Sequence, residues 1–232
     1  MSQQHRAIVE LHNITRTYIQ GEIEVNAVSN LNLTISAGEF TTLCGPSGSG
    51  KTTVLNMIGA LDEPTSGVVT IEGRNLTELN RSEISALRRD RIGFVFQSYN
   101  LIPVLTAYEN AEFVLALQGV KPAERREQVM AILKEVGLEG LEHRRPDEMS
   151  GGQQQRVAIA RAIVTHPAIV LADEPTANVD SATAEALLDL MQELNQNDGV
   201  TFLFSTHDQR VIDRAKRVIH LRDGKLESDI LQ

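Results

Sequence analysis

The arrangement of apolar and polar residues changes character along the chain. Over residues 7–40 the two kinds alternate, with glycine and asparagine breaks, and this pattern predicts a series of short antiparallel strands. Residues 41–44 complete a further strand that leads into a glycine-rich loop, and residues 52–61 have the pattern of a helix. From residue 97 to 161 helical patterns dominate, which predicts a helical subdomain inserted in the rest of the fold.

The strongest helical segment of this stretch is 124–136, and Thr106 and Glu109 have the spacing of a capping box. From residue 168 onward, apolar strands at 169–172, 201–205 and 218–221 alternate with helical sequence. The helix predicted at 182–194 carries its apolar residues at i, i+4 and i+7, namely Leu187, Met191 and Leu194.

These patterns predict an α/β fold with an N-terminal antiparallel β subdomain and an inserted α-helical subdomain. We expect a single domain over 1–232. Within it, 1–96 holds the antiparallel β region and the glycine-rich loop, 97–161 is mainly helical, and 162–232 completes the α/β core.

Composition narrows the possible partners and compartment. The chain has 232 residues and a net charge of −9, which argues against a general affinity for nucleic acid or anionic lipid. Its only cysteine, Cys44, cannot form an internal disulfide and fits a reducing compartment. No apolar run approaches the roughly 18–20 residues that span a bilayer, and residues 1–11 lack a signal-peptide apolar region. We therefore expect a cytoplasmic protein that acts at a membrane only through a partner.

The glycine-rich loop, GPSGSGKT at Gly45–Thr52, matches the phosphate-binding pattern, and it stands between a strand and a helix as such loops do. Its glycines let backbone N–H groups converge on an anion, and the following helix adds the positive end of its dipole. Lys51 is placed for the β- and γ-phosphates of a nucleotide, and the Thr52 hydroxyl for Mg²⁺. A glycine-rich loop with a chance lysine is the alternative. The residues expected to bind nucleotide here are Gly45, Pro46, Ser47, Gly48, Ser49, Gly50, Lys51, Thr52 and Thr53.

Three further motifs follow in a fixed order: MSGGQ at Met149–Gln153, IVLADE at Ile169–Glu174 and STHD at Ser205–Asp208. Together with the phosphate loop, this set resembles the ABC-type ATPases over nearly the whole chain. Within them it is most similar to the LolD/MacB/FtsE group of bacterial ATPase subunits. The resemblance implies an ABC-ATPase core of the P-loop NTPase class, with ATP and Mg²⁺ as its ligands.

The resemblance also implies roles for the strand-end residues. Asp173 would organise Mg²⁺, Glu174 would be the general base for the attacking water, and His207 would contact the γ-phosphate and align that water. Gln97 would sense Mg²⁺ and link the core to the helical subdomain. The catalytic set is then Glu174, His207 and Lys51, and the metal set Thr52, Gln97 and Asp173. The alternatives are an Asp-Glu pair that caps a helix or turn, a solvent-facing histidine and a solvated loop glutamine.

Other residues are implied to act across a dimer. Ser150, Gly151, Gly152 and Gln153 would close over the γ-phosphate held by the other protomer, although Ser150 could equally serve only as a helix N-cap. Asp180 lies in a segment that resembles the loop crossing the dimer interface, and Tyr18 stands where the family places an aromatic ring against adenine.

The function expected from this resemblance is that of an energy-coupling subunit, in which two copies close on two Mg-ATP and drive a membrane permease of the lipoprotein-release, macrolide-export or mechanotransmission type. The alternative is a soluble ABC ATPase acting on DNA or ribosomes. It is disfavoured because the stretch 53–149 has no sustained heptads and the chain has one cassette. Residues 99–105, an apolar stretch interrupted by Pro103, are the expected docking site for the permease, unless Leu101, Ile102 and Leu105 instead fill the core of the helical subdomain.

Overall fold

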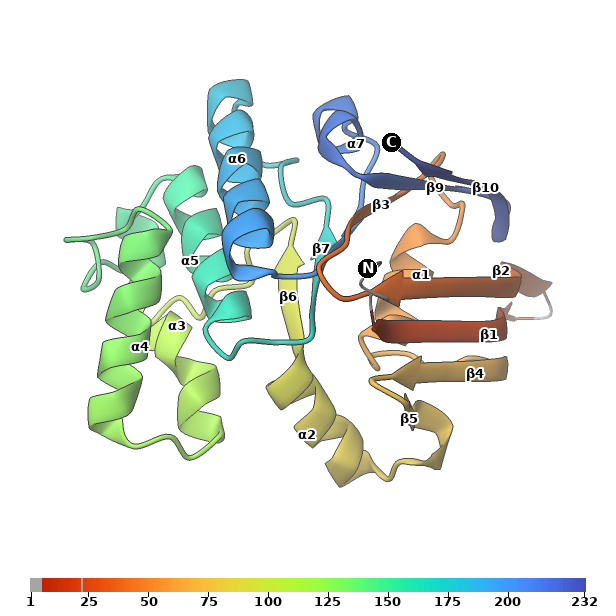
Figure 1. The fold of residues 1–232 in the computed structure, drawn as a ribbon, viewed down its shortest axis with the longest axis horizontal. Coiled ribbons are helices and arrows are strands. Elements are labelled where there is room, and N and C mark those ends of the chain that lie inside the picture. The colour runs from red at the N-terminus through yellow and green to blue at the C-terminus, as the bar shows by residue number, and fades with distance from the viewer. Residues whose placement is uncertain (1–5, 22) are drawn as a thin grey trace, which may run out of the picture.

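A computed structural model describes residues 6–21 and 23–232. Residues 1–5, part of the segment 1–11 in which no signal peptide was predicted, lie outside the described residues. The described chain contains two β-sheets (Figure 1). The larger has six strands in the order β10-β9-β3-β8-β7-β6, and the smaller has four in the order β2-β1-β4-β5. The strands of the larger sheet are β3 (Phe40–Cys44), β6 (Ile92–Phe96), β7 (Ile169–Asp173), β8 (Phe202–Ser205), β9 (Arg217–Arg222) and β10 (Lys225–Leu231).

The larger sheet is parallel except at its β10 edge. Strands β3 and β8 are buried along their whole length, as expected for a parallel sheet covered on both faces. Side chains of successive residues point to opposite faces, so Val170 belongs to one apolar core and Ile169 and Leu171 to the other. The order of strands, the parallel register and the two cores confirm the α/β class predicted from the sequence.

The smaller sheet corrects one prediction. Residues 7–40 do not form a series of short strands: they form two long ones, β1 (Ala7–Gln20) and β2 (Ile23–Ser36), before β3 begins. Asn13 and Asn30 adopt the left-handed conformation, with φ of 51° and 49°, where the β1–β2 register shifts. Asparagine tolerates this conformation, so each becomes a bulge inside a continuous strand rather than its end. The sheet is completed by β4 (Ser66–Ile71) and β5 (Arg74–Asn75).

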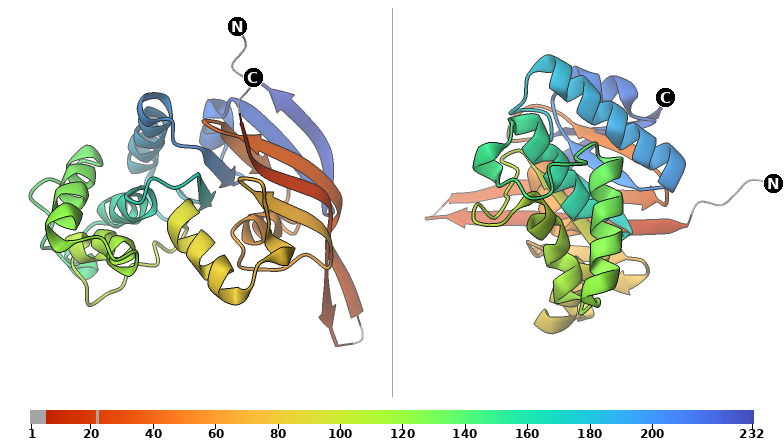
Figure 2. Two further views of the ribbon diagram at one scale, coloured as in Figure 1. Left: turned by 60° about the horizontal axis from the view of Figure 1, so that its bottom comes forward. Right: turned by 90° about the vertical axis from the view of Figure 1, so that its left-hand side faces the viewer.

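The helices lie on both sides of the larger sheet. Helix α1 (Lys51–Ile58) contributes Val54, Leu55, Met57 and Ile58 to the core shared with the smaller sheet. Helices α3 (Ala107–Leu117), α4 (Pro122–Glu135) and α5 (Gly151–Ile163) gather at the opposite end of the molecule from the smaller sheet (Figure 2). They share the second core with α6 (Ser181–Asp198).

The predicted capping box before α3 is confirmed, because the Glu109 N–H donates to Thr106 Oγ1 at 3.2 Å and the Thr106 N–H to Glu109 Oε2 at 2.8 Å. The helix predicted at 52–61 ends three residues earlier, at Ile58, since Gly59 packs against the Phe94 ring and Ala60 turns to a φ of 51°. The structure contains two further helices that were not predicted from the sequence, α2 (Arg81–Arg91) and α7 (Gln209–Arg214). Within the described part of the chain, none of the helices has the length and apolar character needed to span a membrane.

Candidate functional site

Parallel strands bring three of the four motifs, those at 45–52, 169–174 and 205–208, together at one edge of the larger sheet. Asp173, the last residue of β7, is in register with Phe96 at the end of β6 and with Ser205 at the end of β8. The next residues along the chain are therefore Gln97, Glu174 and Thr206, and the phosphate loop leaves β3 at the same edge. Ligands of open α/β sheets bind beyond the carboxyl ends of the strands. This edge is the candidate site.

The phosphate loop (residues 45–52) is shaped by close backbone contacts. Gly45 has a φ of 145°, and a Cβ on it would stand 2.1 Å from the Leu221 carbonyl oxygen, so the tight approach of β9 excludes any side chain here. Helix α1 begins after Gly50, which offers no side-chain acceptor for the first N–H groups of the helix. The Lys51 ammonium folds back over the loop and donates to the carbonyl oxygens of Gly45 at 2.8 Å and Pro46 at 3.0 Å.

A cleft of about 620 Å³ opens in front of this loop. Thr52 Oγ1 lies 3.3 and 3.4 Å from the two carboxylate oxygens of Asp173. The residues that line the cleft, which we call the phosphate-loop cleft, are Ala27, Gly45, Pro46, Ser47, Gly48, Ser49, Gly50, Lys51, Thr52, Thr53, Gln97, Asp173, Glu174, Ala177, Ser205 and His207. The structure thus brings together every residue predicted from the phosphate loop with Gln97, Asp173, Glu174 and His207.

The donor set of the cleft fits a nucleotide and its metal. Two hydroxyl oxygens lining it, Ser49 Oγ and Ser205 Oγ, are buried and have no hydrogen-bond partner among the described residues. Buried polar atoms are normally paired, so both suit a polar ligand. Thr52, Asp173 and Gln97 offer hydroxyl, carboxylate and amide oxygens, the hard donors that Mg²⁺ prefers.

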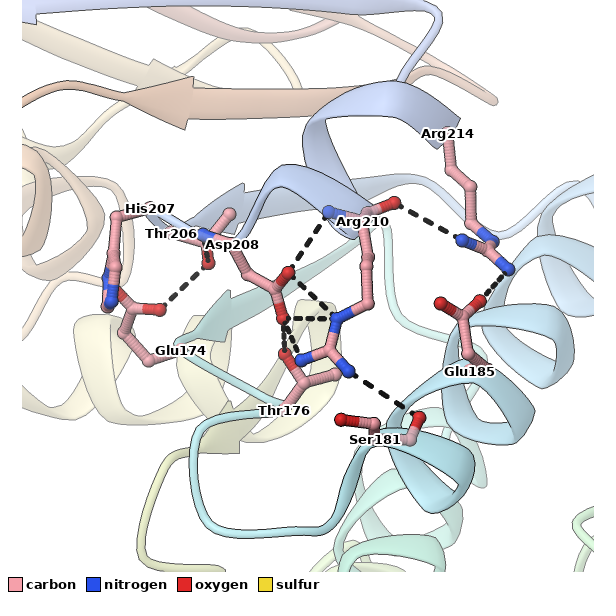
Figure 3. A network of polar contacts seen from close by, with 9 residues as sticks. All are labelled: Glu174, Thr176, Ser181, Glu185, Thr206, His207, Asp208, Arg210 and Arg214. Carbon is pink, nitrogen blue, oxygen red and sulfur yellow. Dashed lines mark hydrogen bonds and ion pairs between the residues drawn. The ribbon is translucent and has the colours of Figure 1, made fainter.

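Glu174 is held in an unusual conformation at the mouth of the cleft. Its φ is 46°, and its N–H donates to the Ser205 carbonyl at 2.9 Å. Its carboxylate has two partners: Oε2 accepts from the Thr206 hydroxyl at 2.8 Å, and Oε1 lies 2.6 Å from His207 Nδ1 (Figure 3). The side chain of His207 is 78% exposed and that of Glu174 only 19%. The predicted base and histidine are therefore neighbours, with the histidine on the solvent side.

Gln97 is exposed, and its main chain connects the cleft with the segment before α6. The Asn178 side chain donates to the Gln97 carbonyl at 2.9 Å, and the Tyr99 hydroxyl donates to the Asn178 carbonyl at 2.9 Å. Burial raises the pKa of the Tyr99 phenol. These contacts tie the ends of β6 and β7 together beyond the sheet.

The Ser150–Gln153 motif lies outside the phosphate-loop cleft of its own protomer. It begins α5 with a complete capping box, in which the Gln153 N–H donates to Ser150 Oγ at 3.3 Å and the Ser150 N–H to Gln153 Oε1 at 3.0 Å. A Cβ on Gly152 would stand 2.3 Å from the Thr183 side chain, so this glycine is needed for close packing against α6. Ser150 itself is exposed.

Asp180 and Tyr18 also lie outside the cleft lining. Asp180 is the N-cap of α6, and hydrogen bonds from the Thr183 hydroxyl and N–H hold the pKa of its carboxyl below the usual value. The Tyr18 hydroxyl donates to Asp62 at 2.6 Å, and the Arg16 guanidinium lies 4.5 Å from the centre of its ring. One cation already contacts the ring that the sequence suggested for adenine.

The expected docking segment, residues 99–105, has no regular secondary structure and divides into anchored and exposed residues. Leu101 packs against the helical core, and the buried Asn110 side chain bonds the backbone of Ile102 and Leu105. Arg161 donates to the carbonyls of Asn100 and Tyr99, and its burial lowers its pKa. Val104 is 71% exposed.

Four polar residues that support the site could not be assigned a contact from the sequence pattern: Thr206, Gln155, Asp208 and Arg210. Thr206 contacts Glu174 directly, and the buried Gln155 of α5 donates to the Pro175 carbonyl at 2.7 Å. Asp208, the last residue of the strand-end motif, is bonded by Arg210, which lies two residues beyond it. The STHD motif contains two of these four residues, but only the register of β7 and β8 shows what they touch.

Comparison with known proteins shows the family to which the chain belongs. Residues 28–177 match the family described as ABC transporter. The chain is 47% identical to the macrolide export ATP-binding/permease protein MacB of Hyphomonas neptunium, over 96% of this chain and 34% of the relative. It thus spans about a third of MacB. It is 44% identical to the lipoprotein-releasing system ATP-binding protein LolD of Anaeromyxobacter dehalogenans, over 95% of this chain and 93% of the relative.

A solved structure supports the same placement. The dimeric post-hydrolysis state of the ATP-binding cassette MJ0796, bound to ADP and Pi, superimposes with a TM-score of 0.88 at 46% identity. The match covers 97% of this chain and 98% of that one. MJ0796 is a protein of Methanocaldococcus jannaschii.

Proposed function

The chain belongs to the ABC transporter family and is an ABC-type ATPase, and from this premise we propose that it is the ATP-hydrolysing subunit of a membrane complex. The observation that carries the proposal is the Glu174 carboxylate, held between His207 and Thr206 at the mouth of the phosphate-loop cleft. A carboxylate fixed beside a phosphate site is suited to take a proton from an attacking water.

The residues of the cleft divide into those that hold the triphosphate and those that serve the reaction. Backbone N–H groups of residues 47–53, which include the N-terminus of α1, bind the phosphates, and Lys51 leaves its loop carbonyls to contact the β- and γ-phosphates. Thr52, Asp173 and Gln97, which line the cleft, would hold Mg²⁺. When bound, Mg²⁺ neutralises charge that develops on the phosphate oxygens.

Hydrolysis then depends on two residues of this chain. Glu174 accepts the proton of the attacking water on its carboxylate. His207, 2.6 Å from that carboxylate and exposed to the cleft, hydrogen-bonds the γ-phosphate and keeps the water in line. Adenine would lie against the face of the Tyr18 ring opposite the one that Arg16 contacts.

The working form that we propose is a homodimer with composite sites. The exposed N-terminus of α5, with Ser150, Gly151, Gly152 and Gln153, would close over the γ-phosphate bound by the partner protomer, with Asp180 at the interface. The dimeric state of the MJ0796 cassette supports this arrangement.

The partner that receives the work would be a membrane permease, which places the chain at the cytoplasmic face of the inner membrane. Support comes from two relatives, the macrolide export ATP-binding/permease protein MacB and the lipoprotein-releasing system ATP-binding protein LolD. Residues 99–105 are the proposed docking segment, and the exposed Val104 is its contact residue. A Val104→Asp variant should keep ATPase activity and lose the co-purified permease, whereas Leu101→Asp should lower the melting temperature because Leu101 packs in the core.

The test of the proposed function is Glu174→Gln. Loss of a positioned base costs roughly 10²- to 10⁴-fold in turnover, while the phosphate contacts remain. The variant should bind ATP with unchanged affinity, turn it over at least about 100-fold more slowly, and accumulate as an ATP-dependent dimer in size-exclusion chromatography. Glu127→Gln, the same change on the exposed face of α4, is the control and should hydrolyse ATP normally. Near-normal hydrolysis by Glu174→Gln would falsify the assignment of the base.

A further inference from the structure

The carboxylate of Glu174 needs support from outside its own strand. Its backbone has a φ of 46°, a left-handed conformation that non-glycine residues rarely adopt, so the surrounding contacts must hold it there. One of its two side-chain partners, His207, is largely exposed. The other, Thr206, is fully buried.

The two hydrogen bonds of the Thr206 hydroxyl determine the direction of its proton. The Asp208 N–H donates to Thr206 Oγ1 at 3.0 Å, which occupies an acceptor position of the hydroxyl oxygen. The single hydroxyl proton is then directed at Glu174 Oε2, 2.8 Å away. Thr206 therefore fixes one oxygen of the carboxylate and leaves the other for His207.

Asp208 in turn anchors the loop that carries Thr206, through its own carboxylate. Its carboxylate accepts from the Thr176 hydroxyl at 2.9 Å, from the Arg210 N–H at 3.0 Å, and from the Arg210 guanidinium at 2.6 to 3.1 Å (Figure 3). Thr176 is buried and lies two residues after Glu174. The carboxylate of Asp208 thus links the loop after β8 to the loop after β7 through Thr176. Thr206 links the same two loops a second time, through Glu174.

The same cluster reaches toward α6. Arg210 NH1 lies 3.5 Å from the Ser181 carbonyl, a long contact with the first turn of that helix (Figure 3). Arg214 adds ion pairs with Glu185 and Asp189 of α6 and donates to the Arg210 carbonyl at 3.3 Å. The residues that hold Glu174 in place are therefore themselves in contact with the long helix α6.

We propose that Thr206 and Asp208 are positioning residues that hold the Glu174 carboxylate in line for water activation, Thr206 by a direct hydrogen bond and Asp208 by fixing the loop that carries Thr206. This inference rests on the proposed role of Glu174 as the base. Neither residue lines the phosphate-loop cleft. Their removal therefore acts on the chemical step and leaves ATP binding to the phosphate loop.

The direct test compares Thr206→Val with Thr206→Ser by steady-state kinetics of the full chain. Valine keeps the buried shape and removes the hydroxyl, while serine keeps the hydroxyl. A catalytic group misplaced by about 1 Å can cost on the order of 100-fold in rate. We expect Thr206→Val to lower kcat between about tenfold and 100-fold with KM for ATP within about twofold, and Thr206→Ser to restore kcat to within about threefold of the wild type.

Asp208→Asn provides the second variant, since it removes the charge that gathers Thr176 and Arg210 and should lower kcat with the same unchanged KM. Its control is Glu72→Gln, which weakens a bidentate pair with Arg91 of similar geometry away from the cleft and should leave kcat as it is. Should Thr206→Val fail to give a cooperative melting transition, Asp208→Asn decides the question alone.

Three outcomes would overturn the proposal: wild-type kcat in Thr206→Val, an equal loss of kcat in Thr206→Val and Thr206→Ser, or wild-type kcat in Asp208→Asn. Glu174→Gln run in parallel separates the two levels of inference. Active Glu174→Gln overturns the base assignment, whereas inactive Glu174→Gln with an active Thr206→Val overturns only the positioning role.

Discussion

Two helices of this protein begin at glycine-rich motifs, and their N-termini are completed in different ways. Helix α1 starts after Gly50, which supplies no side chain to its first N–H groups. Helix α5 starts after Ser150, which closes a capping box with Gln153. An uncapped helix N-terminus leaves N–H groups that need an acceptor, while a capped one satisfies part of its own requirement.

The glycines of the two motifs are also required for different reasons. Those of the phosphate loop, Gly45, Gly48 and Gly50, all have positive φ, so they shape the backbone itself. Gly151 and Gly152 sit in ordinary helix, where a Cβ would stand 2.6 Å from the Tyr99 hydroxyl and 2.3 Å from Thr183. The first motif is built to wrap an anion, and the second is built to lie close to its neighbours while its exposed tip faces outward.

The largest expected effect separates the two N-termini by function. Lys51→Ala removes the cation above the open N-terminus of α1, where charge-assisted hydrogen bonds contribute about 1.5–3 kcal/mol each. ATP affinity should fall by about tenfold to 100-fold and turnover by at least about 100-fold. Lys121→Ala, at the exposed N-cap of α4, is the matched control for binding and hydrolysis assays. Wild-type ATP affinity in Lys51→Ala would contradict the role of the open N-terminus.

The next effect asks whether the capped N-terminus serves the other protomer. Lys51→Ala and Ser150→Arg proteins should each be inactive alone, but a mixed heterodimer has one intact composite site out of two. Mixing them should restore part of the ATPase activity, measured against each variant at the same total concentration. If hydrolysis needs both sites at once, nucleotide-dependent heterodimers should still form. The absence of both would show that Ser150 is only an N-cap.

A smaller effect concerns stability. Ser150→Ala removes the N-cap side chain of α5 and should lower the free energy of unfolding by about 1 kcal/mol, or roughly 2–4 °C in Tm for a chain of this size. Binding of ATP to a single protomer should not change, because Ser150 lies outside the phosphate-loop cleft. Calorimetry measures the expected loss of stability, and nucleotide titration measures the expected unchanged ATP affinity. Ser150→Thr, which retains the capping hydroxyl, should restore most of the lost stability.

A further prediction concerns a charged N-cap. Asp208 caps α7, and hydrogen bonds from Arg210 lower the pKa of its carboxyl from 3.8 to about 2. A depressed pKa in the folded state gives stability that is present above the unfolded pKa and is lost as pH falls through the folded one. Stability should therefore decline between about pH 4 and pH 2, with a smaller decline in Asp208→Asn. Equal acid sensitivity of the two proteins, followed by circular dichroism, would exclude this contribution.

Much of the fold could be predicted from local pattern. The α/β class, the helices at 124–136 and 182–194 and the capping box of Thr106 follow from periodicity and end signals, and the structure confirms them. The two long strands of residues 7–36 could not be predicted. Whether asparagine ends a strand or forms a bulge depends on the partner strand, and the partner is a tertiary fact.

The sequence by itself determined which chemical groups stand at the ends of which strands. The glycine, lysine and carboxylate motifs can be recognised in the sequence because each consists of residues only a few positions apart. They led to the same family that the comparisons show. Their roles in catalysis and binding remain predictions, which the variants above address.

Only the tertiary structure decided what supports those groups. Thr206, Asp208 and Thr176 meet because β7 and β8 are adjacent in register, although the two loops lie some thirty residues apart in the chain. Tyr99 reaches Asn178 for the same reason, through β6 and β7. A hydrogen bond requires two atoms within about 3 Å, and no local pattern carries the distance between residues that only strand pairing brings together.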